Sequence, residues 1–471
     1  LQPCIMDHLL NAFETQRTSL RQVSTASERR TMLGRLWESV LAHESELVRA
    51  LAADLGKPRE EVHLQEIYPV KAEIAHARKH LRGWMAPKPT PTPLAMLGTR
   101  SLVQPEPKGQ LLIISPWNFP VILTLRPLVS ALSAGNRVIL KPSEHTPETS
   151  KVLASIVEQA VPADVATVVL GGPEVSAKLT SLPFQHICFT GGTNIGKKVM
   201  KAAAENLASV TLELGGKSPA VVDATAHLGD ASRRLAWGKC LNNGQVCIAP
   251  DYALVEDAVA DRFLTEVVAR IGEMYGDSAE AQLMNPQRSR MVNRHHWQRL
   301  VGLIEDAVEK GARVVLGGHW NQDELRIAPT VLDGVTVDMK VMQEEIFGPV
   351  LPVLRWHDAN EVNQIVSLNP HPLAMYFFSK NDAAVESWMR SNPAGTTGIN
   401  EVILQVAQPD LPFGGIQTSG MGRTGGHEGF KQFSNMRSVV RQQTRHNILP
   451  LTFPPFGERS LWLARTVQRW L

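Results

Sequence analysis

The chain has little of what marks a secreted, disulfide-stabilised or zinc-binding protein. Its 471 residues contain four cysteines, Cys4, Cys188, Cys240 and Cys247, with no C-x-x-C pair among them. Four scattered cysteines in so long a chain neither form a disulfide framework nor match a zinc site. The first residues, LQPCIMDHLL, lack the charged start, long apolar run and cleavage site of a signal peptide. We therefore expect a cytoplasmic protein without a metal.

Strong charge and long apolar runs are also missing. The formal net charge is +2, whereas a nucleic-acid partner requires a clustered basic face. No stretch approaches the ~18 uninterrupted apolar residues of a membrane span, so we expect a soluble protein. No internal repeat or low-complexity region is present. A single core rarely grows to this length, so two or three domains are expected.

The first hundred residues are predicted to be helical and then extended. The patterns over 28–55 and 64–84 are typical of helices, and the first of them ends near Gly56-Lys57-Pro58. The segment MAPKPTPTPLAML (85–97) contains prolines, which forbid a helix and favour an extended or linker conformation.

From residue 110 onward, short apolar runs alternate with helical segments. The runs of the first series are LLIIS (111–115), RVILK (137–141), ATVVL and HICFT, and a buried helix is expected over 121–134. A second series runs from VTLELGG (210–216) to about residue 400. Strands that are apolar on both faces and separated by helices indicate α/β units with parallel sheets. Such sheets bind ligands at the carboxyl ends of their strands.

Cys247 is a candidate nucleophile. In NNGQVCIAPDY it follows a polar turn that contains a glycine, where an exposed and activated side chain is expected. A thiolate is the nucleophilic form of cysteine. The alternative is a small buried hydrophobic residue, the commoner fate of a cysteine. We expect that fate for Cys240, on an apolar helical stretch, and for Cys188, inside HICFT.

Glu213 is a candidate general base. It lies in the otherwise apolar strand VTLELGG, where burying a carboxylate is costly unless it is paired or protonated. The glycines that follow allow a close approach. A partly buried glutamate with a raised pKa suits proton transfer near neutral pH. The alternative is an exposed strand end or an arginine partner.

Asn118 and a glycine-rich turn are further candidates. Asn118 lies in SPWNFP, between a strand and a helix, and its amide is suited either to an oxyanion or to capping the helix. FTGGTNIGKK places Gly191, Gly192 and Gly196 between a strand and a helix, where backbone amides can approach a phosphate. The spacing does not match G-x-G-x-x-G, so the motif is weak by itself.

Seven stretches, in this order and spacing, resemble the aldehyde dehydrogenase superfamily: SPWNFP, AGNRVILKPSE, FTGGTNIGKK, LELGGKSP, NNGQVC, EEIFGP and PFGGIQTSGMGR. The glutamate of LELGGKSP, followed thirty-four residues later by the cysteine of GQVC, is the most specific element. CIAPDY and PLTFPPFG resemble the class 3 branch, which includes fatty, aromatic and coniferyl aldehyde dehydrogenases. The resemblance covers about residues 111–439.

The resemblance implies an NAD(P)-dependent oxidation of an aldehyde to an acid. Cys247 would be the nucleophile, Glu213 the base that activates water, and Asn118 an oxyanion donor together with the Cys247 backbone amide. The implied cofactor contacts are Trp117, Lys141, Glu144, Gly191, Gly192, Gly196, Leu214, Glu345 and Phe347. Glu144 near the ribose would repel a 2′-phosphate and favours NAD, whereas Lys141 beside it leaves NADP as an alternative.

The family fold implies a Rossmann-like cofactor domain, an α/β catalytic domain and a small β arm that joins two subunits. The expected bounds are 1–85 and 106–212, 213–400, and 86–105 with about 424–445, followed by a tail over 446–471. A homodimer is implied. The amphipathic SLWLARTVQRWL of the tail is expected to pack on that dimer, with a membrane surface as the alternative.

Two departures and two rival functions remain. Gly192 stands where many relatives have a serine that reaches the phosphate, and Phe119 where the class 3 branch often has tyrosine.

A CoA-acylating enzyme would share the thioester, but Glu213 argues against it, since CoA needs no activated water. A catalytically silent protein of the same fold is disfavoured by the intact Cys247, Glu213 and Asn118.

Overall fold

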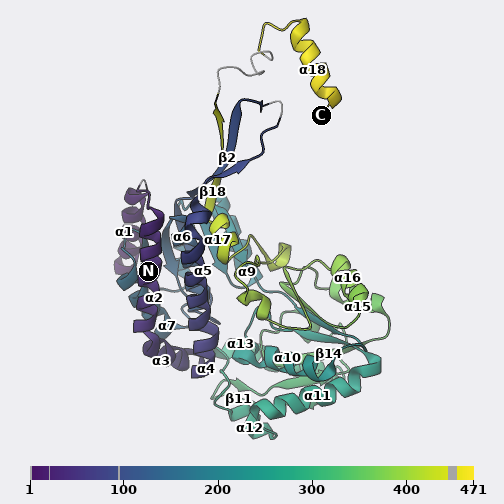
Figure 1. Cartoon of the computed structure of the whole chain (residues 1–471). Coiled ribbons are helices and arrows are strands. Elements are labelled where there is room, and N and C mark those ends of the chain that lie inside the picture. Colours follow the sequence, from purple (N-terminus) through teal and green to yellow (C-terminus); the bar gives the residue numbers. More distant parts are fainter. Residues whose placement is uncertain (1–2, 21, 94–95, 444–452, 471) are drawn as a thin grey trace.

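The computed structural model describes residues 3–20, 22–93, 96–443 and 453–470. Two α/β units form the body, and a ribbon of antiparallel strands projects from it (Figure 1). The parallel α/β architecture expected from the apolar runs is confirmed.

Helices make up the first 85 residues: α1 (Pro3–Ser19), α2 (Ala26–Ala42), α3 (Glu44–Leu55), α4 (Arg59–Glu61), the π-helical η1 (Val62–Ile67) and α5 (Tyr68–Met85). The expectation of one helix over 28–55 is wrong, because the chain leaves helical geometry at His43. Its Nδ1 lies 2.8 Å from the Ser39 carbonyl, and its backbone N–H also bonds within the last turn of α2. These bonds satisfy carbonyls at the end of α2 and allow α3 to start in a new direction.

The first sheet has the order β17-β7-β6-β3-β4-β5. Its strands are β3 (Gln110–Ile114), β4 (Arg137–Lys141), β5 (Ala166–Val168), β6 (His186–Thr190), β7 (Ser209–Glu213) and the antiparallel β17 (Gly420–Met421). The connecting helices are α6 (Ile122–Ala134), α7 (Pro147–Ala160), α8 (Pro173–Thr180) and α9 (Thr193–Glu205). Every residue of β3 and β4 is buried, which accounts for their unbroken apolar runs.

The second sheet has the order β10-β13-β14-β9-β8-β15-β16, with only β10 antiparallel to its neighbour. Its strands are β8 (Pro219–Val222), β9 (Tyr252–Glu256), β10 (Arg313–Leu316), β13 (Thr330–Asp333), β14 (Val350–Trp356), β15 (Ala374–Phe378) and β16 (Thr396–Ile399). The helices are α10 (Leu228–Cys240), α11 (Asp257–Tyr275), α12 (Ala279–Met284), α13 (Arg294–Glu309), α14 (Lys340–Gln343), α15 (Ala359–Ser367) and α16 (Asp382–Ser391). A hairpin of β11 (Trp320–Asn321) and β12 (Arg326–Ile327) lies apart from this sheet.

The projecting ribbon consists of β1 (Lys88–Thr90), β2 (Thr99–Pro107) and β18 (Ser434–Gln442) (Figure 1). β2 pairs with β18 along its whole length, from Ser434↔Pro107 to Gln442↔Thr99. α17 (Gly426–Gln432) leads into β18, and α18 (Glu458–Trp470) ends the chain. Residues 94–95 of the expected arm, and 444–452 and 471 of the expected arm and tail, lie outside the described residues.

Candidate active site

The candidate nucleophile comes from a buried loop that connects α10 to β9. After α10 the chain forms a short 3₁₀ turn, η3 (Leu241–Gly244), in which Asn242 and Asn243 have φ values of 45° and 54°. Asparagine tolerates this left-handed region better than most residues. Gly244 is also left-handed, with φ 74°, and a Cβ there would overlap the backbone of Gly348. The loop therefore depends on residues with unusual backbone freedom to deliver Cys247.

The Cys247 side chain is half-buried, whereas Cys188 and Cys240 are buried. Burial, followed by the Glu345 and Glu213 carboxylates, raises the pKa of the Cys247 thiol to about 12. Backbone amides of the loop oppose this shift. In the ligand-free protein the thiol is therefore protonated at neutral pH.

Glu213 ends β7 and is buried. Burial raises the pKa of its carboxyl to about 8, and the Thr424 hydroxyl and the cations of Arg126 and Arg423 oppose that rise. The Thr424 Oγ1 donates to Glu213 Oε1 at 3.2 Å. Glu213 Oε2 has no hydrogen-bond partner within the described residues. A buried carboxyl with one unoccupied oxygen is suited to exchange a proton with a water molecule.

Asn118 is held against the nucleophile loop. Its Nδ2 donates to the Gln245 carbonyl at 2.9 Å, and its side chain is buried. The residue before α6 is Val121, and no side-chain capping bond is formed there. The sequence alternative, that Asn118 caps this helix, is therefore not what the structure has.

Two aromatic rings predicted at the cofactor lie together. The rings of Trp117 and Phe347 are 5.4 Å apart in an edge-to-face arrangement. His296, at the start of α13, is 5.3 Å from Trp117. Burial and nearby cations lower the pKa of His296 to about 4, so the imidazole is neutral. No local pattern indicates His296, because it reaches the site from a helix that is distant in the sequence.

The remaining cofactor candidates other than Glu345 lie at or after the carboxyl ends of strands of the first sheet. Lys141 ends β4, and its Nζ is 2.6 Å from Glu144 Oε2. Gly192 precedes α9, where no side chain caps the helix. A Cβ at Gly192 would meet nothing within 4 Å, whereas one at Gly196 would lie 2.6 Å from Leu214. The start of α9 thus leaves backbone N–H groups and space for a phosphate.

Glu345 lies beside the nucleophile loop, close to Gly215, where a Cβ would overlap its carboxylate. Burial raises the pKa of Glu345 to about 8, and Asp251 adds to the rise. A buried ion pair anchors this segment: Lys217 Nζ is 2.6 Å from Asp251 Oδ2 and donates to the Glu344 carbonyl at 3.0 Å. Glu345 and Glu213 thus both lie close enough to Cys247 to raise the pKa of its thiol.

The aldehyde dehydrogenase family model matches residues 6–439. The putative aldehyde dehydrogenase AldX of Bacillus subtilis is 41% identical over 445 residues, covering 93% of this chain and 98% of that protein. The chain belongs to the aldehyde dehydrogenase family. A probable coniferyl aldehyde dehydrogenase of Caulobacter vibrioides is 41% identical over 445 residues, covering 92% and 91%, which supports the class 3-like branch. The substrate-bound structure of Staphylococcus aureus AldH matches with a TM-score of 0.92 and 38% identity, covering 97% and 99%.

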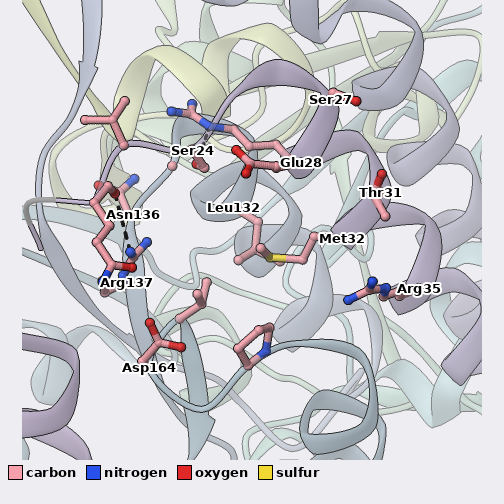
Figure 2. Close-up of a pocket in the computed structure, with 16 residues that line it drawn as sticks. Ser24, Ser27, Glu28, Thr31, Met32, Arg35, Leu132, Asn136, Arg137 and Asp164 are labelled. Atoms are coloured by element: carbon pink, nitrogen blue, oxygen red, sulfur yellow. Dashed lines mark hydrogen bonds between the residues drawn. The ribbon is translucent and has the colours of Figure 1, made fainter. Parts of the chain in front are cut away.

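A cavity of about 450 Å³ beside α2 is separate from this site (Figure 2). Its lining includes two buried arginines, Arg29 of α2 and Arg137. Arg137 begins β4, at the end opposite to Lys141. Arg29 donates to the Ser133 carbonyl at 2.8 Å, near the end of α6, and Arg137 donates to the Ser19 carbonyl at 3.0 Å, where α1 ends. Cations are favourable at helix C-termini. These arginines thus join helices of the aldehyde dehydrogenase fold.

Sequence reasoning missed the residues that hold the candidates in place. The sequence places Lys57 only at a helix end and Thr424 only at the start of the expected arm segment, about 424–445. Both contact candidate residues far away in the sequence, Asn118 and Glu213 respectively. Periodicity carries no signal for such contacts. The burial of a lysine beside a helix end is set by the tertiary structure, and no local sequence pattern indicates it.

Proposed function

We propose that the protein oxidises an apolar aldehyde to the carboxylic acid with NAD, through a thioester on Cys247. The observation that carries the proposal is the convergence of three elements on one thiol. The carboxylates of Glu213 and Glu345 both raise the pKa of the Cys247 thiol, and the Asn118 side chain is hydrogen-bonded to the loop that bears this thiol.

Cys247 begins the reaction. Its thiol gives its proton to water, and the sulfur forms a bond to the carbonyl carbon while the carbonyl π electrons move to oxygen, which gives a thiohemiacetal oxyanion. The Asn118 side-chain amide and the Cys247 backbone amide stabilise that oxyanion, and loss of one such donor typically costs ~3 kcal/mol of barrier. The former aldehyde hydrogen then leaves with its electron pair, and the carbonyl re-forms as a thioester.

Glu213 serves the second half. It takes a proton from water, and the resulting hydroxide adds to the thioester carbon and expels the Cys247 thiolate, which releases the acid. A pKa of about 8 suits this exchange near neutral pH, because the carboxyl both accepts and returns a proton readily.

NAD supplies the hydride acceptor when it is bound. Residues of the chain that would hold it are Trp117, Lys141, Glu144, Gly191, Gly192, Gly196, Leu214, Glu345 and Phe347. The uncapped start of α9 suits the pyrophosphate, and the Glu144 carboxylate disfavours a 2′-phosphate. The Lys141–Glu144 ion pair weakens the repulsion between Glu144 and a 2′-phosphate, so slower use of NADP is included in the proposal.

The substrate is proposed to be aromatic or a medium- or long-chain aliphatic aldehyde. Cys247 and Trp117 are partly buried side chains that pack on the main hydrophobic core. Such surroundings favour apolar substrates over charged ones.

The proposed organisation follows the family. A cofactor domain spans 1–85 and 106–212, a catalytic domain spans 213–400, and an arm of 86–105 with about 424–445 joins two copies in the cytoplasm. Within the described residues, no helix is long and apolar enough to cross a membrane.

The decisive experiment follows NADH formation with benzaldehyde, coniferaldehyde, hexanal and hexadecanal, with NAD and NADP in parallel. Cys247→Ala should abolish the signal. Glu213→Gln should retain a first turnover of NADH while slowing acid release. Normal steady-state turnover by Glu213→Gln would show that another group is the base, and a requirement for CoA would show that the thioester goes to another acceptor.

A further inference from the structure

A fully buried ion pair lies behind Asn118. Lys57 Nζ is 2.7 Å from Glu66 Oε1, and neither side chain is exposed to solvent. Lys57 follows α3, and Glu66 lies in the π-helical segment η1. Removing two charges from water is costly, and apolar residues of similar volume often serve stability equally well. Stability alone therefore does not account for this pair.

The contacts of the pair converge on one short turn. Lys57 Nζ also donates to the main-chain carbonyl of Asn118 at 3.0 Å. Glu66 Oε2 accepts the backbone N–H groups of Val121 and Ile122, both at 3.1 Å, where α6 begins. The two opposite charges thus hold both ends of the turn that carries Asn118.

Asn242 completes the connection from the other side. Its Nδ2 donates to the Asn118 carbonyl at 2.9 Å and to the Gln245 carbonyl at 3.3 Å. The Asn118 Nδ2 itself donates to the Gln245 carbonyl at 2.9 Å. That bond uses one of the two N–H groups of the Asn118 amide and leaves the second for another acceptor. The turn and the nucleophile loop are therefore bonded to each other in a fixed orientation.

We propose that Lys57, held by Glu66, and Asn242 are positioning residues that aim the free N–H of Asn118 at the oxyanion formed on the Cys247 adduct. The proposal rests on the proposed function. An oxyanion donor stabilises charge only from the correct position, so loosening the turn should weaken catalysis while leaving the donor present. Neither positioning residue needs to touch the substrate.

The test is a double-mutant cycle between Lys57→Met and Asn118→Ala. Methionine removes the charge and keeps much of the length. We expect Asn118→Ala to lower kcat roughly 100-fold and Lys57→Met roughly 10-fold, with the KM for NAD unchanged. In the Asn118→Ala background, Lys57→Met should change kcat less than about twofold, because the group it positions is already gone.

Alkylation of Cys247 by iodoacetamide supplies a readout that a merely structural role would move. This reaction forms a sulfur–carbon bond and no oxyanion, so its rate should be the same in Lys57→Met and the parent protein. Should Lys57→Met fold poorly, the double variant Lys57→Met/Glu66→Gln removes both buried charges and keeps an amide oxygen for the N–H groups of Val121 and Ile122. It should restore the melting temperature and not the kcat.

Asn242 has a matched control in its neighbour. Asn242→Gly and Asn243→Gly both remove an amide from a left-handed position that glycine adopts without strain. Asn243 Nδ2 donates to Met291 Sδ and its Oδ1 accepts from Arg288, so this side chain is equally engaged but has no bond to Asn118. We expect the larger loss of kcat in Asn242→Gly.

Two results would overturn the proposal: full multiplicative effects of Lys57→Met and Asn118→Ala, or an equal fall in alkylation and oxidation rates. Persistence of NADH formation in Cys247→Ala would instead refute the proposed function, so the two failures are distinguishable.

Discussion

Burial changes the pKa values of the residues at this site more than any direct charge pair does. Burial is the largest cause of the raised pKa values of Cys247, Glu213 and Glu345, and both carboxylates add to the rise at Cys247. Each group therefore favours its neutral form, and removal of either carboxylate should lower the pKa of Cys247.

The Cys247 thiol should titrate late in the ligand-free protein. With a pKa of about 12, its alkylation by iodoacetamide should keep rising between pH 8 and 10 and show no plateau. Glu345→Gln removes a nearby negative charge and should shift the profile to lower pH. Mass spectrometry assigns the label, and the buried Cys188 and Cys240 are internal controls. A plateau near the ordinary cysteine pKa would contradict the assigned environment.

Glu213 should make stability depend on pH. Its folded pKa, about 8, lies above the ordinary 4.5, so folding favours the protonated form. That contribution is fully present below about pH 4.5 and is lost as pH rises through 8, at up to about 1.4 kcal/mol per pH unit. Glutamine cannot ionise, so Glu213→Gln should raise the melting temperature relative to the parent at pH 8.5 and have little effect at pH 5. Equal shifts at both pH values would exclude this ionisation as the cause.

At the scale of single elements, α9, η1 and η3 position the groups of the candidate site. The start of α9 is open at Gly192 and closed at Gly196, four residues on, because Leu214 packs there. The π-helical η1 brings Glu66 to the start of α6, and the left-handed loop η3 brings Asn242 to Asn118. Each of these elements departs from regular helix geometry where a polar contact is made.

The start of α9 offers a matched pair of substitutions. Gly192→Ser adds a hydroxyl into open space beside the predicted phosphate and should lower the KM for NAD a few-fold. Gly196→Ser places its Cβ against Leu214 and should raise that KM or lower the melting temperature. Initial rates at varied NAD test both. A KM unchanged by Gly192→Ser would place the phosphate away from this helix.

At the scale of the molecule, the two large sheets supply the residues of the candidate site, and the third sheet forms the ribbon that projects from the body (Figure 1). The first sheet carries Lys141 and Glu213, whereas the loop of Cys247 follows a helix of the second unit. β2 and β18, which are distant in sequence, pair over nine residues each in the projecting ribbon. β18 is an edge strand of that described sheet, with Val440 exposed.

An exposed edge is suited to a second copy of the chain. We predict a dimer in sedimentation experiments, and Val440→Asp should shift it toward monomer because a charge would be buried at the contact. The control is Val308→Asp, an exposed valine of α13 and not of a sheet edge, which should leave the dimer intact. Dimers of equal stability in both variants would exclude β18 as the contact.

Much of the fold was predictable because its signals are local. Fully buried strands must be apolar on both faces, so RVILK and HICFT were predicted at the bounds that the structure has. The break at His43 was missed because both sides have helical periodicity, and the bonds that end α2 involve a backbone geometry that composition does not encode.

The sequence by itself determined the class of fold and the family, and it predicted the candidate reactive side chains, since these depend on residue type, order and spacing. Only the tertiary structure decided which groups meet. Lys57 and Asn118 are separated by 61 positions, and Thr424 and Glu213 by 211, yet each pair is bonded. Burial and charge act through space, so the raised pKa values of Cys247 and Glu213 and the anchoring of Asn118 follow from packing that no local pattern records.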